Sequence, residues 1–172
     1  MDLRPFAPAD AATVARWPLS AGEVAMWCGP RDFPVTARVV AGWQLDADTR
    51  GYVLVEGEGL LGYGEVWCDE DEGEAELARI IVAPDTRGRG AGRRLVRGLA
   101  ALALRGGYAE IFLRVHPENT AALRCYRGAG FLPVDPALAA EWNAPQPVSY
   151  VWLRDAGAAA GVAGTTGAAG AL

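Results

Sequence analysis

The chain of 172 residues has no lysine, two serines, one histidine and three cysteines. Without lysine it cannot supply the lysine of a P-loop, of a protein-kinase site or of a Schiff base with pyridoxal phosphate. Neither serine lies in a G-x-S-x-G motif, which argues against a serine hydrolase. The three cysteines, Cys28, Cys68 and Cys125, form no C-x-x-C pair, so neither a metal site nor a disulfide framework is predicted.

Charge and hydropathy exclude further classes. The sequence has 16 basic residues, all arginine, and 21 acidic residues. The resulting net charge of −5 disfavours a nucleic-acid binder. No uncharged run of 18 strongly apolar residues predicts a membrane span, and the N-terminus lacks the basic and apolar regions of a secretory signal. Unpaired thiols suit a reducing compartment. We therefore expect a cytoplasmic protein with no nucleic-acid or membrane partner.

The composition predicts one domain and a tail. Half of the residues are apolar (51%), which is enough for a sizeable core in a chain of this length. Residues 156–172 contain almost only alanine, glycine and threonine, and so few large side chains cannot offset the entropy of ordering them. We expect a domain over residues 1–155 and a flexible tail over 156–172.

Hydrophobic periodicity predicts an α/β (α+β) fold. Strands are expected near residues 3–6 and at 51–56, 60–68, 75–82, 109–115, 131–134 and 148–153, with an irregular segment between the last two. Helices are expected at 8–16, 91–105 and 119–129, and two short ones within 17–48. A hairpin followed by strand–helix–strand predicts a mixed sheet with helices on both faces and one right-handed parallel crossover over 76–115.

The segment from Val82 to Gly92 carries the clearest chemical signal. A strand ends, a loop with glycines at 88, 90 and 92 turns, and a helix begins. Glycines let backbone N–H groups converge, and the helix N-terminus adds partial positive charge, so the loop predicts an anion site. Its spacing, G-x-G-x-G, differs from the dinucleotide-binding fingerprint. Four arginines add positive field there: Arg87, Arg89, Arg93 and Arg94.

A second segment follows at a suitable distance. Asn119 begins the next predicted helix, Tyr126 lies two turns further, and Gly130-Phe131 ends it. The two segments together, R-G-x-G-x-G and N-x-x-A-x-x-x-Y-x-x-x-G-F, resemble motifs A and B of the GNAT superfamily of acetyl-CoA-dependent N-acetyltransferases. The resemblance covers about residues 76–134. It implies a central, mostly antiparallel mixed sheet of six to seven strands, and it allows a homodimer.

The resemblance also implies roles for single residues. The strand before the loop would carry a bulge and pair through its backbone with the pantetheine arm and acetyl group of acetyl-CoA. Tyr126 would protonate the leaving thiolate, and Asn119 would contact the cofactor beyond the pyrophosphate. The cofactor-binding residues would be Ile80, Ile81, Val82, Arg87, Gly88, Arg89, Gly90, Ala91, Gly92, Arg93, Asn119 and Tyr126.

The chemistry of amine acetylation requires a proton acceptor as well. A lysine-like amine with a pKa of about 10.4 is almost wholly protonated at neutral pH, so a base or a water must take its proton. The candidates are Glu76, on the strand before the glycine loop, Glu65, on the neighbouring strand, and His116. Each also has an ordinary interpretation as a solvated or loop residue. Cys125 is expected to point away from Tyr126 as a buried thiol.

The acceptor is left open by the sequence. A small cationic metabolite, an aminoglycoside-like antibiotic and a peptide amine all fit, although Arg114 stands where some members place an acid, which argues against a ribosomal-protein-type N-terminal acetyltransferase. The acidic run 69–74 could steer a cation, and Trp27 and Trp43 could line a pocket or belong to the core. Two alternatives are a non-catalytic acyl-CoA-binding module and a mononucleotide binder.

Overall fold

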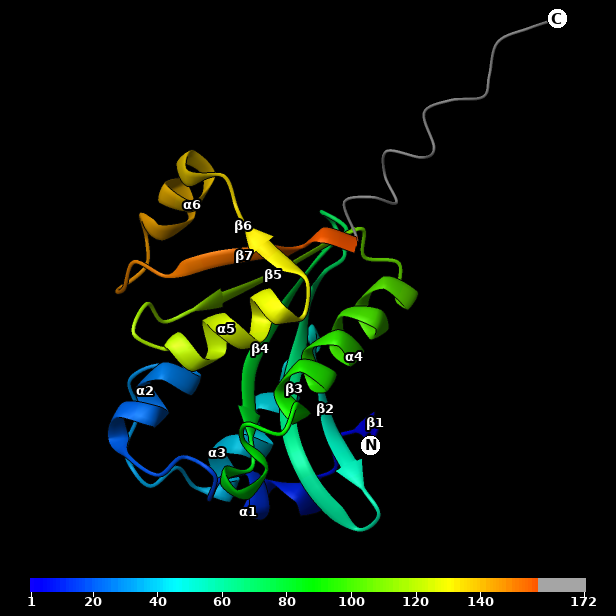
Figure 1. Cartoon of the computed structure of the whole chain (residues 1–172). Helices are drawn as coiled ribbons and strands as arrows, with labels where there is room; N and C mark the ends of the chain where they lie inside the picture. Colours follow the sequence, from blue (N-terminus) through cyan, green and yellow to red (C-terminus); the bar gives the residue numbers. More distant parts are fainter. Residues whose placement is uncertain (158–172) are drawn as a thin grey trace, which may run out of the picture.

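The computed structural model describes residues 1–157, and these form a seven-stranded mixed sheet with helices on both faces (Figure 1). The strands lie in the order β1-β2-β3-β4-β5-β7-β6, and only β4 and β5 are parallel neighbours. This confirms the predicted mixed sheet with one parallel crossover. The strand bounds are β1 Asp2–Pro5, β2 Thr49–Glu56, β3 Gly59–Asp69, β4 Glu74–Val82, β5 Glu110–Val115, β6 Phe131–Pro133 and β7 Val151–Asp155.

Two long amphipathic patterns place the principal helices, α4 Ala91–Arg105 and α5 Thr120–Gly128, within a residue or so of the prediction. The predicted helix 8–16 is a 3-10 turn, Pro8–Asp10, continued by α1 Ala11–Val14. The two short helices expected within 17–48 are α2 Ala21–Cys28 and α3 Ala37–Gly42. The segment predicted to be irregular instead contains α6 Pro136–Asn143, whose first turn is capped by the carboxylate of Asp135.

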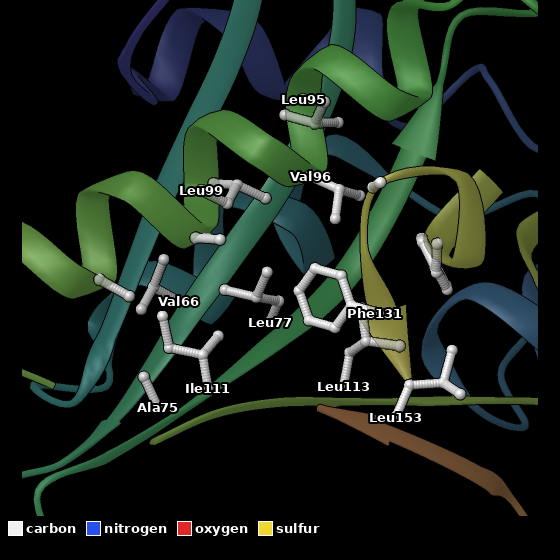
Figure 2. Packing of buried hydrophobic residues seen from close by; sticks show 14 of the residues in the cluster. Val66, Ala75, Leu77, Leu95, Val96, Leu99, Ile111, Leu113, Phe131 and Leu153 are labelled. Atoms are coloured by element: carbon white, nitrogen blue, oxygen red, sulfur yellow. The ribbon is translucent and has the colours of Figure 1, made fainter. Parts of the chain in front are cut away.

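The sheet buries a different cluster on each face. On one face, Leu95, Val96 and Leu99 of α4 pack on apolar side chains of β3, β4, β5 and β7, as Figure 2 shows. On the other face, α1, α2 and α3 cover β2, β3 and β4 through a cluster rich in tryptophan. Fully burying a leucine contributes roughly 1.5–3 kcal/mol. These two clusters therefore hold the sheet as a rigid layer between its helices.

The parallel pair β4–β5 stays paired only at its start. Glu74, Ala75 and Glu76 pair with three residues of β5, and beyond them the two strands separate. Opposite β3, the register of β4 shifts between Tyr63 and Glu65, and Arg79 has a φ of 45°. The implied bulge is therefore present. It leaves the second half of β4 with an edge that pairs with no strand among residues 1–157.

The predicted domain over 1–155 stays a prediction, as does the tail. Residues 158–172 of the predicted tail lie outside the described residues. Within the described part, Ala156 N–H donates to the carbonyl of Gly130, 3.3 Å away. No helix within residues 1–157 has the length and apolarity needed to cross a bilayer.

Candidate active site

A cleft of about 680 Å³ opens where β4 and β5 separate. Its walls are the second half of β4, the loop that follows, the start of α4, one side of α5 and part of α2. The cleft brings together most of the residues that the sequence analysis assigned to the cofactor: Ile80, Ile81, Val82, Arg87, Gly88, Gly90, Gly92, Arg93, Asn119 and Tyr126. Arg89 and Ala91 do not line it; Ala91 is buried beneath the first turn of α4.

The glycine loop presents unused backbone donors to this cleft. Gly88 and Gly90 have φ values of 77° and 86°, a region that other residues adopt only at a cost. Gly90 is the N-cap of α4 and supplies no side-chain acceptor. Among residues 1–157, the N–H groups of Gly88, Gly90, Ala91, Gly92 and Arg93 donate to no backbone or side-chain acceptor. Such a set of donors at a helix N-terminus suits a pyrophosphate.

Gly92 has a different role from the one its place in the motif suggests. A Cβ there would lie 3.0 Å from Sγ of Cys125 and 3.5 Å from Val82. The glycine thus lets α4 approach α5 closely. Cys125, expected to point elsewhere on the helix than Tyr126, lies against the first turn of α4 and lines the cleft, and burial raises the pKa of its thiol.

The arginines of the loop are not equivalent. Arg87 forms an ion pair with Glu23 of α2 at 3.0 Å, and it also donates to the carbonyl of Trp17. Arg93 lies over α5, because a Cβ on Gly128 would come within 2.8 Å of its guanidinium. Arg94 donates from Nε to the carbonyl of Met1. Arg93 therefore remains the loop arginine that borders the cleft and forms no ion pair within residues 1–157.

The free edge of β4 offers main-chain groups to the acyl end of a ligand. Ala83 N–H donates to the carbonyl of Leu61 in β3, so the hydrogen-bonding groups of Val82 point the opposite way. The same alternation directs those of Ile80 toward the cleft. Ile80 and Val82, rather than Ile81, therefore direct their N–H and C=O groups to this edge, where the carbonyl of Val82 accepts from Nε of Arg87 at 3.3 Å.

Asn119 and Tyr126 lie on the opposite wall. Oδ1 of Asn119 accepts from Ala122 N–H at 3.1 Å and so caps α5, while its amide NH₂ has no acceptor within residues 1–157. Tyr126 is 7% exposed. Its hydroxyl has no partner in the described chain, yet no unpartnered polar side-chain atom there is fully buried, so the oxygen reaches the cleft. Burial raises the pKa of Tyr126, which keeps it a protonated donor.

Glu65 does not line the cleft. It is fully buried beneath α3, and its carboxylate accepts from Tyr63, from Trp67 Nε1 at 2.6 Å, from Gln44 at 3.4 Å and from Arg79 at 2.8 Å. Burial raises the pKa of Glu65, and the Arg79 charge with the hydrogen bonds opposes that rise. With both oxygens occupied, the geometry gives no support to Glu65 as the proton acceptor.

Glu76 and His116 lie outside the cleft walls as well. Glu76 is 22% exposed and pairs with Nε of Arg114 at 3.0 Å, while burial raises its pKa against the opposing charge of Arg114. It precedes Ile80 by four residues, roughly 13 Å along a strand, so a proton from the acyl site would reach it through water. His116 accepts from Glu118 N–H and lies edge-on to Tyr150. Of the three candidates, Glu76 is the partly exposed carboxylate, and it lies beside Arg114, which is also partly exposed.

Several residues of the site went unnoticed in the sequence. Glu23 and Met26 line the cleft from α2, and Trp27, considered for a pocket, lines it too, whereas Trp43 is buried beside it. Thr120 and Arg124 line it from α5; the motif spacing alone would have placed them there, since both share a helix with Asn119 and Tyr126. No feature of the sequence marked Arg79 as part of the site, because the position of a bulge is set by the pairing with the partner strand.

The acetyltransferase (GNAT) family profile matches residues 20–131, which include β2 to β5, α4, α5 and the whole cleft wall. The chain belongs to the GNAT acetyltransferase family. Within residues 1–157 of this GNAT protein, no three His, Cys, Asp or Glu side chains gather as metal ligands would.

Relatives match over parts of their length. The chain is 40% identical over 83 residues to the uncharacterized N-acetyltransferase YobR of Bacillus subtilis, with 48% of this chain and 33% of that one covered. It is 37% identical over 87 residues to the streptothricin acetyltransferase of Streptomyces lavendulae, with 50% and 46% covered. The chain thus spans between a third and a half of the length of these relatives.

Solved structures share the fold over nearly the whole chain. AAC(6')-Ib in complex with ribostamycin and coenzyme A aligns with a TM-score of 0.69 at 22% identity, covering 97% of this chain and 98% of that one. Spermidine N-acetyltransferase from Vibrio cholerae, in complex with CoA and spermine, aligns with a TM-score of 0.66 at 18% identity, covering 89% and 92%. At these identities the likeness establishes the GNAT fold.

Proposed function

We propose that this GNAT protein transfers an acetyl group from acetyl-CoA to a primary amine of a small molecule by direct attack. One observation carries the proposal: a single cleft holds the unused N–H donors of Gly88, Gly90, Gly92 and Arg93 at the mouth of α4, the free edge of β4 and the hydroxyl of Tyr126. These are an anion site, a partner for an extended chain and an acid, in the order in which acetyl-CoA would need them.

The residues fit acetyl-CoA from one end to the other. The unused N–H groups of Gly88, Gly90, Gly92 and Arg93 would hold the pyrophosphate, and the free amide of Asn119 would bind beyond it. The N–H groups of Ile80 and Val82 and the carbonyl of Ile80 would pair with the pantetheine arm, while the carbonyl of Val82 already accepts from Nε of Arg87. When bound, acetyl-CoA supplies an activated acetyl group and a thiol as leaving group.

The side chains then support the transfer. An N–H at the edge of β4 would stabilise the oxyanion that forms when the amine nitrogen bonds to the thioester carbon. As the C–S bond breaks, Tyr126 would give its proton to the departing sulfur and regain one from solvent. The amine would lose its proton to water, and the partly exposed carboxylate of Glu76 would receive that proton through the water.

A small-molecule acceptor is favoured over a protein N-terminus. Streptothricin, ribostamycin and spermine appear in the names of the relative and the neighbours. A further relative is the N-alpha-acetyltransferase RimI of Mycobacterium tuberculosis, 48% identical over 58 residues, with 34% of this chain and 35% of that one covered. Arg114 at the position where some members place an acid weighs against a ribosomal-protein-type N-terminal acetyltransferase. A homodimer stays a prediction.

The test is release of free thiol from acetyl-CoA in the presence of amines. Aminoglycosides, streptothricin, polyamines and short peptides form the panel, and mass spectrometry identifies the acetylated product. We expect amine-dependent thiol release with a small-molecule acceptor and saturable acetyl-CoA binding by calorimetry. Binding without turnover on any amine would favour the non-catalytic acyl-CoA-binding module. Competition by a mononucleotide without binding of CoA would favour the nucleotide binder.

A further inference from the structure

Arg79 occupies an unusual place directly behind the cleft. It is the bulged residue of β4, it has a φ of 45°, and Ile80 follows it directly at the edge that faces the cleft. A residue other than glycine at positive φ costs roughly 1–2 kcal/mol, so it persists only where its surroundings hold it. The question is what holds Arg79.

Its side chain is anchored on the face opposite α4. The guanidinium donates to Glu65 at 2.8 Å and lies over the rings of Trp43 and Trp67, with centroid distances of 4.4 and 4.9 Å. It is 18% exposed, and Glu65 is fully buried. A charge-assisted hydrogen bond between such buried groups is much stronger than one in solvent, and removing one partner strands the other.

The main chain of Arg79 is held from another element. Its carbonyl accepts from Nε1 of Trp27 at 2.7 Å, across 52 residues of sequence. Trp27 belongs to α2, packs edge-on against Trp43 and lines the cleft. Side chain and backbone of the bulge are therefore fixed independently, one by β3 and the other by α2.

We propose that Arg79 is a positioning residue of the transferase: its ion pair with Glu65 and its bond from Trp27 fix the bulge that turns the N–H groups of Ile80 and Val82 toward the acyl end of the cleft. The inference rests on the proposed function and deepens it. Glu65 then anchors Arg79 rather than accepting a proton. If the bulge relaxed, the alternation of β4 would shift and these N–H groups would no longer face the cleft, so the one beside the thioester oxygen would be lost.

The direct readout is the carbonyl stretch of bound acetyl-CoA labelled with ¹³C at the acetyl carbonyl. Infrared difference spectra would be recorded for the wild type, Arg79→Met and Trp27→Phe, with calorimetry of acetyl-CoA binding alongside. We expect the wild type to shift the stretch to lower wavenumber than in solution, because an N–H polarises the carbonyl. Both variants should move it back toward the solution value while the Kd changes less than about threefold, since the pyrophosphate loop is intact.

Kinetics and a matched variant separate positioning from stability. Trp27→Phe keeps a ring and removes the donor to Arg79, whereas Trp17→Phe replaces a similarly buried indole of the same cluster whose Nε1 donates nothing to the bulge. With a small amine acceptor, Trp27→Phe should lower kcat about tenfold at nearly unchanged KM for acetyl-CoA, and Trp17→Phe should leave kcat within about twofold. Trp27→Phe also keeps the test valid if Arg79→Met fails to fold.

The outcomes are distinct. Wild-type carbonyl frequency and kcat in Trp27→Phe would overturn the inference, and so would equal losses in Trp27→Phe and Trp17→Phe, which would indicate stability alone. A wild type that binds acetyl-CoA without any carbonyl shift would overturn it while leaving the acetyl transfer standing. No binding of acetyl-CoA by the wild type would remove the proposed function and the inference with it.

Discussion

The two ends of the cleft are built in different ways. The phosphate end is local: the loop from Val82 to Arg93 and the first turns of α5 supply it, and each is a short continuous segment. The acyl end is assembled from distant pieces, with Trp27 bonding to Arg79 across 52 residues and Glu65 bonding to Arg79 across 14. Local chemistry can be found in a sequence as a motif, whereas an assembled site depends on how strands and helices meet.

Tyr126 tests this contrast most strongly, because it belongs to a local motif and acts at the assembled end. Replacing it with phenylalanine should lower kcat roughly 10–100-fold, since the donor to the leaving sulfur is lost. The Kd of acetyl-CoA should stay nearly the same, because the loop donors are untouched. Steady-state kinetics and calorimetry on the Tyr126→Phe variant measure both. Unchanged turnover would show that the thiolate leaves without help from this residue.

The pH dependence of the wild type follows from the same side chain. Burial raises the pKa of Tyr126 above its ordinary value. A raised pKa keeps the acid protonated to higher pH, so kcat should show no alkaline fall from loss of this proton below about pH 10. An alkaline limb near pH 8 that disappears in Tyr126→Phe would contradict this assignment.

At the phosphate end, Gly90 and Gly57 form a matched pair. Both have positive φ values, 86° and 58°, and a Cβ on either would meet nothing within 4 Å. Replacement by alanine should therefore cost each about 1 kcal/mol of unfolding free energy. Only Gly90→Ala should also weaken acetyl-CoA binding, by about tenfold, because relaxing its φ turns N–H groups away from the pyrophosphate.

Urea unfolding and calorimetry on the two glycine variants check this. Gly57 lies in the β2–β3 turn, outside the cleft walls, and serves as the control for backbone strain. Equal affinities for acetyl-CoA in both variants would show that the loop conformation is not what binds the diphosphate. A loss confined to Gly90→Ala would confirm the local character of this end.

The same contrast explains which expectations the structure confirmed. The bounds of α4, 91–105, followed from its apolar spacing and its glycine at each end, which are local signals. The helix α6 was missed although Asp135 and Pro136 are a cap and a first-turn residue, because its apolar stripe is short and packs only on the small cluster that includes Phe112 and Trp152.

Other residues could not be placed by local reasoning at all. Helix geometry separates Cys125 from Tyr126, but nothing in the sequence shows that the close approach allowed by Gly92 brings α4 against its thiol. Glu65 has the residue type of a base. Only the folded chain shows that its carboxylate is occupied, by two donors from β3, by Gln44 just after α3 and by Arg79. Packing between elements decides both cases.

The ion pair of Arg87 with Glu23 joins the glycine loop to α2. Of the features that these variants change, it should contribute least to stability and to acetyl-CoA affinity. Its side chains are 37% and 30% exposed, and such pairs are typically worth about 0–1 kcal/mol. Glu23→Gln should therefore lower the unfolding free energy by less than about 1 kcal/mol and the acetyl-CoA affinity by less than about threefold. Glu141→Gln, an exposed carboxylate in no ion pair within residues 1–157, is the control.

The Arg87–Glu23 ion pair should depend on pH in a definite direction, because Arg87 holds the pKa of Glu23 below its ordinary value. A lowered pKa in the folded state means that the pair stabilises fully above the ordinary carboxyl pKa and is lost as pH falls through the lowered value. The difference between wild type and Glu23→Gln should thus be constant from pH 5 to 8 and shrink below about pH 4. A tenfold loss of acetyl-CoA affinity at pH 7 would instead mean that α2 orders the glycine loop, and that the phosphate end is less local than its sequence indicates.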